Sequence, residues 1–321
     1  MKTMNEKMLE LIKSSNSILI FTHKRPDGDA IGSALALKRI FNLMGKQAQL
    51  CCEDRVPETY SFLQDADEFK FPSEISGSFD LAISIDASDE GRLGKAYPLF
   101  SSIRPNCEID HHATNTYFAD ENEVDSNAPA AGVLAFRLAK NLNVQFDEQL
   151  AGYIYTAIST DTGNFCFSGV NEEIFMQMSE LMETGFPISY IARQIHLNKT
   201  LGHLKLRARA LESLRQYEDA QISAMCLSKK DFEDCKAKNE DGDGIVNSGL
   251  YINGVKLAFL GIEEDDGVKF SLRCLDGFDV SVVAKCFGGG GHRLASGCFI
   301  EDSLENAMQK VLVEMKKELK A

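Results

Sequence analysis

The chain has 321 residues and a mass of 35.5 kDa, and 44% of its residues are hydrophobic, which is enough to bury a core and to form two domains. Its 34 Lys and Arg against 48 Asp and Glu give a formal net charge of −14, which argues against a protein that holds long nucleic acid by neutralising its phosphates. Nine cysteines without a C-x-x-C pair provide neither a disulfide framework nor a thiolate zinc site, and they favour a reducing, cytoplasmic location.

The first half of the chain alternates short apolar runs with helix-period segments, which is typical of an α/β domain on a largely parallel sheet. Residues 17–22 are predicted to form a buried strand and residues 29–43 a helix. The apolar run in this strand is too short for a signal or membrane segment, so we expect a soluble chain without a membrane partner. Residues 80–85 and 106–109 are predicted as further strands that run directly into carboxylates. Because ligands of open α/β sheets collect beyond the carboxyl ends of strands, a functional site is expected there.

The second half is predicted to begin with helices and to end in a second sheet. Helical patterns cover residues 129–159 and 172–215, strands are predicted at 221–227, 255–262 and 268–273, and a terminal helix begins near residue 303. The predicted fold is therefore α/β with two domains. Residues 1–190 form a domain with a largely parallel sheet flanked by helices, residues 191–215 a helical linker, and residues 216–321 a smaller C-terminal α/β domain.

The strongest local signal is the segment from His23 to Ser33, between the first strand and the first helix. His23 ends the strand, and Asp27 and Asp29 follow with Gly28 between them, where a residue without Cβ allows a tight turn. The two carboxylates can then point to opposite sides of one centre and offer ligands to two metal ions. Alternatively, Asp29 caps the helix and Asp27 forms the turn, which would also explain both residues.

Further metal-ligating residue types stand at the ends of other predicted elements. Asp86 and the sequence Asp110-His111-His112 each follow a predicted strand, and Asp161 follows a predicted helix. Taken singly, each aspartate could be a capping residue, and one histidine of an adjacent pair is commonly a surface residue. The same residue types nevertheless reach one region from several segments, which favours a metal site.

These segments resemble the four motifs of the DHH phosphoesterase superfamily, in the order of that family. The matching segments are His23 to Ser33, Ile85 to Gly94, Ile109 to Asn115 and Ser159 to Phe165, with a glycine-rich segment from Gly288 to Gly297. Over nearly the whole chain, the sequence looks most like the bacterial oligoribonuclease (nanoRNase) and 3′-phosphoadenosine-5′-phosphate (pAp) phosphatase branch. Members of this branch pair a DHH domain with a smaller C-terminal substrate-binding domain.

The resemblance implies a site for two metal ions. It assigns one ion to His23, Asp27 and Asp86, and the other to Asp29, Asp86, His111 and Asp161, so that Asp86 bridges them. Carboxylate and imidazole ligands without a thiolate suit Mn²⁺, with Mg²⁺ or Co²⁺ as alternatives. Two such ions can activate a hydroxide for in-line attack on a phosphate.

The resemblance also implies roles for residues that meet the substrate. His112 would face the substrate phosphate, and Asp110 would orient the ligands. The implied substrate-binding residues of the second domain are Arg273, Gly289, Gly290, Gly291 and His292. A guanidinium fork and backbone N–H groups of glycines both suit a phosphate. Without the family, the glycines would be interpreted as a flexible turn and the two cationic side chains as surface residues.

The implied activity is hydrolysis of short RNA oligonucleotides to mononucleotides, with removal of the 3′-phosphate of pAp as a second activity. The acidic charge agrees, because a dinucleotide needs only a few local donors, whereas a stable complex with long nucleic acid needs many phosphate contacts. The alternative enzyme is a phosphodiesterase of cyclic or linear signalling dinucleotides such as cyclic di-AMP, pApA or pGpG. An alternative from a different class is a non-catalytic nucleotide-binding module. The complete set of implied ligands argues against this alternative.

One segment departs from the family, and other properties stay open. The chain reads Ala131-Gly132-Val133 where relatives commonly carry Ser/Thr-Ala/Gly-Glu, so we expect a polar contact near the ligands or the substrate to be missing. Relatives are often homodimers, but no sequence feature here demands a dimer. Cleavage polarity, substrate length limit and native metal are not determined by the sequence.

Overall fold

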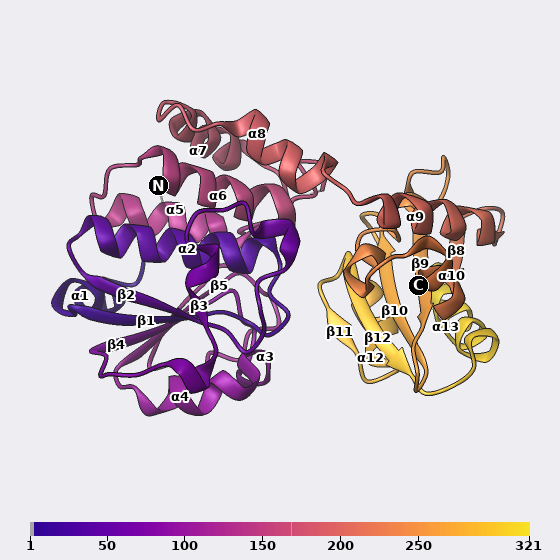
Figure 1. Ribbon diagram of the computed structural model, residues 1–321, viewed down its shortest axis with the longest axis horizontal. Helices are drawn as coiled ribbons and strands as arrows, with labels where there is room; N and C mark the ends of the chain where they lie inside the picture. The colour runs from indigo at the N-terminus through magenta and orange to yellow at the C-terminus, as the bar shows by residue number, and fades with distance from the viewer. Residues whose placement is uncertain (1–2, 168) are drawn as a thin grey trace. The chain divides into compact units, whose positions relative to one another are not determined.

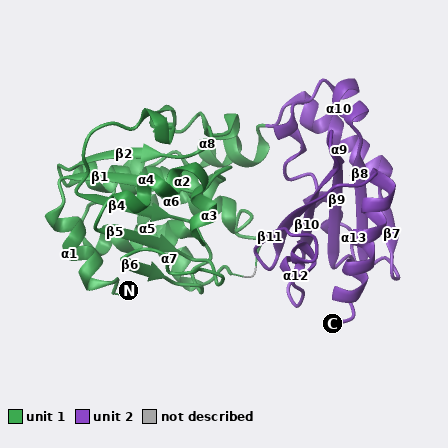
Figure 2. Ribbon diagram, turned by 90° about the horizontal axis from the view of Figure 1, so that it is seen from below, with its two compact units in different colours: residues 1–198 green, residues 199–321 purple. Residues whose placement is uncertain are grey.

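The computed structural model describes residues 3–167 and 169–321 and divides the chain into two compact units, residues 1–198 and 199–321 (Figure 1, Figure 2). The division lies after residue 198, whereas the sequence predicted a separate linker over residues 191–215. The difference arises because helix α9 (Leu201–Ser213) packs Leu206 and Ala210, four residues apart on one helix face, into the core of unit 2. Within the described residues, no helix is long and apolar enough to cross a membrane.

Unit 1 is built on a six-stranded sheet in the order β3-β2-β1-β4-β5-β6, and every pairing in it is parallel, as the sequence predicted. The strands are β1 (Ser17–Phe21), β2 (Gln47–Cys51), β3 (Phe69–Lys70), β4 (Leu81–Ile85), β5 (Asn106–Asp110) and β6 (Glu121–Val124). The strand order reverses between β1 and β4. In doubly wound sheets, the carboxyl ends of the strands at such a reversal flank the ligand-binding crevice.

Helices cover both faces of this sheet (Figure 1). They are α1 (Glu6–Ser14), α2 (Gly28–Leu43), α3 (Glu90–Leu93), α4 (Tyr97–Ser102), α5 (Ala131–Asn141), α6 (Glu148–Asp161), α7 (Glu172–Met182) and α8 (Ile188–Ala192). Helices α2, α5 and α6 pack on one another above one face, and α4 covers the other (Figure 1). A Cβ at Gly32 of α2 would lie 2.7 Å from the carbonyl oxygen of Tyr153, so α2 and α6 approach backbone to backbone. This close contact holds the two motif-bearing helices together.

Unit 2 is a mixed sheet in the order β11-β12-β10-β9-β8-β7, in which only β8 and β9 pair in parallel. Its strands are β7 (Arg215–Tyr217), β8 (Ile222–Leu227), β9 (Leu257–Glu263), β10 (Val268–Cys274), β11 (Gly290–Gly291) and β12 (Ala295–Ile300). Its other helices are α10 (Lys229–Cys235), α11 (Asn247–Leu250), α12 (Val280–Lys285) and α13 (Leu304–Glu318). One apolar core lies beneath α9 to α11 and another beneath α12 and α13. The predicted two-domain α/β fold is thus confirmed.

Candidate metal centre

Three neighbouring strands of unit 1 bring their carboxyl ends to one edge of the sheet. His23 stands two residues after β1, Asp86 directly follows β4, and Asp110 ends β5 with His111 next in the chain. All four side chains are buried. Strand β1 is hydrogen-bonded to β4, and β4 to β5, so the three strand ends are adjacent at the point where the strand order reverses.

The aspartates of the first motif have roles that the sequence did not separate. Asp27, and not Asp29, is the N-cap of α2: its Oδ1 accepts the N–H of Ala30 at 3.0 Å, while its Oδ2 lies 3.7 Å from His23 Nε2. Asp29 lies inside the first turn of α2 and is buried. A Cβ at Gly28 would lie 2.4 Å from the side chain of Thr160, so glycine is required where α2 meets the end of α6.

Asp29 instead caps a different helix. Its Oδ2 accepts the N–H of Ala131 at 2.6 Å, and its Oδ1 accepts the N–H of Gly132 at 3.0 Å and the hydroxyl of Ser33 at 2.9 Å. Helix α5 begins after Ala130, which has no side-chain acceptor of its own, so a carboxylate from α2 satisfies the orphan donors. The sequence predicts a missing polar contact at residues 131–133, but the backbone amides of Ala131 and Gly132 bind Asp29 there.

Asp86 lies between two groups of potential ligands. Its Oδ2 lies 3.7 Å from His23 Nε2, and its Oδ1 lies 3.4 Å from His111 Nε2. His111 Nε2 also lies 3.6 Å from Asp29 Oδ2 and 3.5 Å from Asp161 Oδ2. One group is therefore His23, Asp27 and Asp86, and the other is Asp29, His111 and Asp161, with Asp86 reaching both. Asp161 is the last residue of α6, rather than part of the loop after it.

The orientation of the two imidazoles suits metal binding. His23 Nδ1 lies 2.8 Å from the carbonyl oxygen of Lys24, and His111 Nδ1 lies 3.1 Å from that of Ala128. A carbonyl oxygen only accepts, so each Nδ1 carries a hydrogen, and each Nε2 faces the carboxylates, where a bound ion would take the place of its proton. Metal-ligating histidines are commonly held in this way by a hydrogen bond on the other ring nitrogen.

The electrostatics of the site indicate an excess of buried negative charge. Burial and the charges of Asp27 and Asp86, only partly opposed by His111, raise the pKa of Asp161 to about 7. Burial and the charges of Asp86 and Asp161 raise the pKa of Asp29 well above its ordinary range. For Asp86, burial is outweighed by the hydrogen bond and charges of the surrounding histidines, which lower its pKa. Carboxylates this close cannot all ionise without a compensating positive charge, which bound cations would supply.

The predicted ligands therefore fit divalent metal ions. Ligand atoms about 2.0–2.2 Å from a shared ion lie about 3–4 Å from one another, which is the spacing within each group. Oxygen and imidazole donors suit Mn²⁺, Mg²⁺ or similar ions. The side chains of Asp27 and Asp161 are 56% and 25% exposed, whereas those of His23, Asp29, Asp86 and His111 are nearly inaccessible, so the site is reached by solvent on the Asp27 and Asp161 side.

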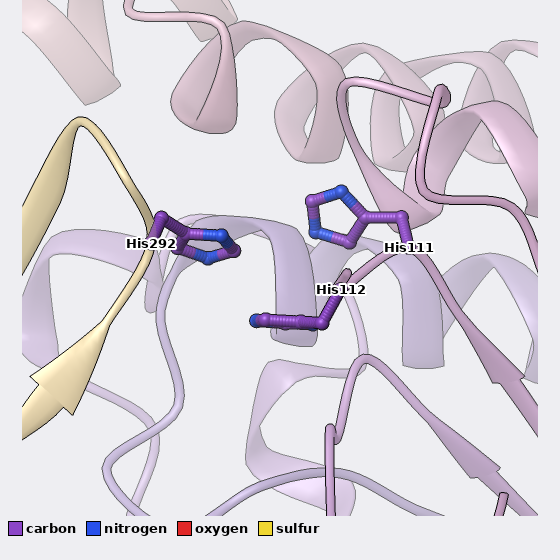
Figure 3. Close-up of side chains that lie close together, drawn as sticks. All are labelled: His111, His112 and His292. Atoms are coloured by element: carbon purple, nitrogen blue, oxygen red, sulfur yellow. The ribbon is translucent and has the colours of Figure 1, made fainter. Parts of the chain in front are cut away.

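His112 lies beside this site, its orientation fixed by Asp110. Figure 3 shows the rings of His111 and His112 on the segment after β5, and their ring centres are 4.8 Å apart. His112 Nδ1 lies 2.7 Å from Asp110 Oδ1, and Asp110 Oδ2 accepts the backbone N–H of His112 at 3.2 Å. Two polar residues around Asp110, Glu108 and Asn115, were not predicted as functional residues from the sequence. The signal available in the sequence was an acidic residue within a predicted strand, two residues before Asp110 and therefore on the same strand face.

The predicted substrate residues of unit 2 lie near one edge of its sheet. Arg273 is on β10, in register with Ala295 of β12, and the glycine segment forms β11 beside β12. The backbone N–H of His292 donates to the carbonyl oxygen of Ala295 at 2.9 Å and closes the turn between β11 and β12. Added Cβ atoms at Gly289 and Gly291 would lie 2.2 and 2.7 Å from backbone oxygens of β12, whereas one at Gly290 would meet nothing within 4 Å.

Comparison with known families agrees with this arrangement. The N-terminal domain of the DHH family matches residues 17–158, and the DHHA1 domain matches residues 222–321. The chain belongs to the DHH family. A bifunctional oligoribonuclease and PAP phosphatase, NrnA of Thermus thermophilus, is 28% identical over 97% of this DHH-family chain and 93% of its own length. The NrnA of Bacillus subtilis is 26% identical over 92% of this chain and 93% of its own.

A more distant relative and two solved structures extend the comparison. The cyclic-di-AMP phosphodiesterase PdeA of Listeria monocytogenes is 23% identical over 97% of this DHH-family chain, which covers 49% of PdeA. An exopolyphosphatase-related protein from Bacteroides fragilis has the same fold, with a TM-score of 0.94 over the full length of both chains at 24% identity. RecJ of Thermus thermophilus, solved with Mn²⁺, matches with a TM-score of 0.55 and 10% identity over 97% of this chain and 54% of its own.

Proposed function

We propose that this protein hydrolyses the phosphoester bonds of short RNA oligonucleotides to release mononucleotides, and that it removes the 3′-phosphate of pAp. The observation that carries this proposal is the position of Asp86, whose two carboxylate oxygens face separate ligand groups. Two divalent ions, preferably Mn²⁺, would be held there. His23, Asp27 and Asp86 would bind one ion, and Asp29, Asp86, His111 and Asp161 the other.

The bound ions would supply Lewis-acid activation of water and neutralisation of phosphate charge. The chain's own side chains would bind and orient the substrate. Asp110 holds His112 with its Nδ1–H directed at the carboxylate, so Nε2 is the ring atom that would meet a phosphate oxygen or a leaving group. Arg273, His292 and the N–H groups of the glycine segment would bind the other end of the substrate, because fork-shaped and backbone donors suit phosphates.

The net charge of the chain bears on the length of its substrate. The chain carries 48 acidic against 34 basic residues, and long nucleic acid is held chiefly by many phosphate-neutralising cations. A substrate of two to five nucleotides needs only the few donors named above. The two NrnA relatives, which align with this chain over nearly their whole lengths, support the same substrate class.

A second candidate is hydrolysis of cyclic or linear signalling dinucleotides. It is supported by the PdeA relative, which matches nearly the whole of this chain. The chain covers only about half of PdeA, and the NrnA relatives are more similar over nearly their full lengths, which favours the oligoribonuclease proposal.

The deciding experiment is a hydrolysis panel with protein loaded with Mn²⁺, Mg²⁺ or Co²⁺. The substrates are pAp, pApA, pGpG, cyclic di-AMP, and RNA of two, five and twenty-four nucleotides. Preferential release of mononucleotides from the two short RNAs, together with adenosine monophosphate from pAp, is the expected result. Turnover of the signalling dinucleotides alone would replace the proposal with the second candidate. Ion binding without turnover of any substrate would indicate a binding module.

A further inference from the structure

We propose that Glu108 and Asn115 are positioning residues that hold Asp110 and, through it, the ring of His112. The inference rests on the proposed function, in which His112 meets the substrate phosphate. Neither residue belongs to the ligand groups around Asp86. The proposal concerns the direction in which the His112 ring points and the ring nitrogen that carries its hydrogen.

The central observation is an amide nitrogen shared between two carboxyl groups. Glu108 and Asp110 are two residues apart on β5, so their side chains leave the same face of the strand, and both are fully buried. Asn115 Nδ2 lies 2.6 Å from Glu108 Oε1 and 2.6 Å from Asp110 Oδ2. The two N–H groups of a single amide are thus divided between the two acids.

The orientation of this amide is fixed by the backbone. The N–H of Tyr117 donates to Asn115 Oδ1 at 2.7 Å, and a backbone N–H can only donate. The oxygen of Asn115 must therefore face Tyr117, and its nitrogen must face the two acids. A flipped amide would place its oxygen against Asp110 and would lose the Tyr117 contact at the same time.

The two acids have different surroundings, which favour a protonated Glu108 and an ionised Asp110. Burial and the nearby charges of Asp110 and Asp89, partly opposed by the Asn115 hydrogen bond, raise the pKa of Glu108 to about 8. Asp110 accepts hydrogen bonds from Asn115 Nδ2, from the backbone N–H of His112 and from His112 Nδ1, and such a set of donors favours the ionised form. Glu108 Oε2 is buried and has no hydrogen-bond partner among the described residues, and an unpartnered buried anion is costly. Glu108 is thus a neutral acid at pH 7 that anchors Asn115, and Asp110 is the anion.

The consequence reaches the His112 ring in two steps. Asn115 holds Asp110 Oδ2, and Asp110 Oδ1 accepts from His112 Nδ1 at 2.7 Å. Removing the amide leaves Asp110 Oδ2 with the longer hydrogen bond from the backbone N–H of His112 at 3.2 Å, so the carboxylate and the tautomer of the ring are held less firmly. A purely structural role would instead show itself as lower stability, with an unchanged ring.

The test combines Asn115→Ala with Asn122→Ala as a matched control. Asn122 also lies after β5, but among the described residues its side chain forms its hydrogen bonds with the backbone of Ala119. In full-length protein labelled with ¹⁵N-histidine, the Nδ1–H signal of His112, assigned by its loss in His112→Gln, should weaken or vanish in Asn115→Ala and persist in Asn122→Ala. Calorimetry with Mn²⁺ should show the same number of bound ions in both variants.

Kinetics on two-nucleotide RNA provide the second readout. We expect kcat to fall by about tenfold to a hundredfold in Asn115→Ala, which is the range found for residues that hydrogen-bond to the groups of a metal site. KM should change by less than about threefold. Glu108→Gln, which mimics the neutral acid, should retain wild-type kcat within about twofold, whereas Glu108→Leu should resemble Asn115→Ala.

The outcomes separate this inference from the proposed function. An unchanged His112 signal together with unchanged kcat in Asn115→Ala would overturn the positioning role while leaving the oligoribonuclease proposal intact. If no RNA or nucleotide is hydrolysed, the proposed function fails, and loss of the His112 signal in Asn115→Ala still supports the positioning role. A loss of bound Mn²⁺ in Asn115→Ala would contradict the inference, because it would make Asn115 a support of the metal site.

Discussion

The two units hold their predicted functional residues in different ways. In unit 1 the side chains around Asp86 are buried at the ends of parallel strands, and neighbouring backbone groups fix several of them. In unit 2 the predicted residues lie on and beside the β11–β12 turn, where Gly290 and Gly291 are exposed. A rigid, crowded set of charges suits metal ions, which require fixed ligand spacing. Exposed backbone donors on glycine suit phosphates of differing position.

Substitutions in the two units are therefore expected to have different effects. Substitutions in unit 1 should change charge balance and metal binding. Substitutions in unit 2 should change substrate affinity or the local stability of the turn.

The largest effect is expected from Asp86→Asn. Asp86 has a left-handed φ of +61°, and asparagine tolerates this conformation better than alanine, so the fold should persist. The substitution removes the charge shared by the two ligand groups, and metal binding and turnover should both fall below detection. Calorimetry with Mn²⁺ and the hydrolysis panel measure this, with circular dichroism as the check on folding. Two ions bound with normal turnover would refute the bridging role.

Metal removal and restoration should act on unit 1 alone. Free Mn²⁺ at 100 times its Kd stabilises the folded state by about 2.7 kcal/mol, which is about 5–10 °C in Tm for a unit of this size. Thermal unfolding of chelator-treated protein, with and without Mn²⁺, should therefore show one shifted transition. Hydrogen exchange assigns the shift, since amides of β1 and α5 should gain protection while those of β8 and β9 should not. An equal gain in amide protection in both units would contradict this expectation.

The pH dependence of stability should reveal the buried acid at Glu108. Its pKa is raised to about 8 from an ordinary 4.5, so the folded protein keeps a proton that the unfolded chain releases. Stability therefore falls as pH rises through this interval and levels off above about pH 8. Glu108→Gln does not ionise, so its Tm should exceed that of the wild type by a margin that grows from pH 5 to pH 8. Glu90→Gln, at an exposed carboxyl, serves as control. A Tm difference that does not change with pH would contradict the assignment of Glu108 as a neutral acid.

Within unit 2, Gly291→Ala and Gly290→Ala form a matched pair. Gly291 has a φ of +137°, and an added Cβ would lie 2.7 Å from the carbonyl oxygen of Ala295. This substitution should destabilise the turn by about 1–3 kcal/mol. Gly290→Ala should change the free energy of unfolding by less than about 0.5 kcal/mol, because nothing lies within 4 Å of the added atom. Denaturant unfolding compares them, and equal effects would show that the turn is not constrained as described.

The smallest effect is expected for His292→Ala. Loss of one hydrogen bond to a charged phosphate should raise KM for two-nucleotide RNA by about tenfold. The Mn²⁺ stoichiometry should stay that of the wild type, because His292 belongs to unit 2 and the proposed ligands belong to unit 1. Unchanged KM would remove His292 from the substrate site.

Much of unit 1 could be predicted from the sequence, and particular residues show why. The core strands β1 and β4 consist almost entirely of apolar side chains, so they stand out as buried runs. The edge strands β3, with two residues, and β6, which reads Glu-Asn-Glu-Val, carry no such signal, and they were not predicted. Their pairing depends on the strand beside them. The hairpin of β11 and β12 was missed for the same reason.

The ligand types and their order along the chain were determined by the sequence, because each potential ligand stands at the end of an apolar or helical pattern that local propensity defines. Their partners were decided only by the tertiary structure. Asp29 is bonded to amides more than one hundred residues away, and no local pattern contains that information. The exchange of the capping role from Asp29 to Asp27 and the sharing of Asn115 between two acids depend on packing in the same way. Burial then sets the pKa values, since the cost of a charge depends on what surrounds it.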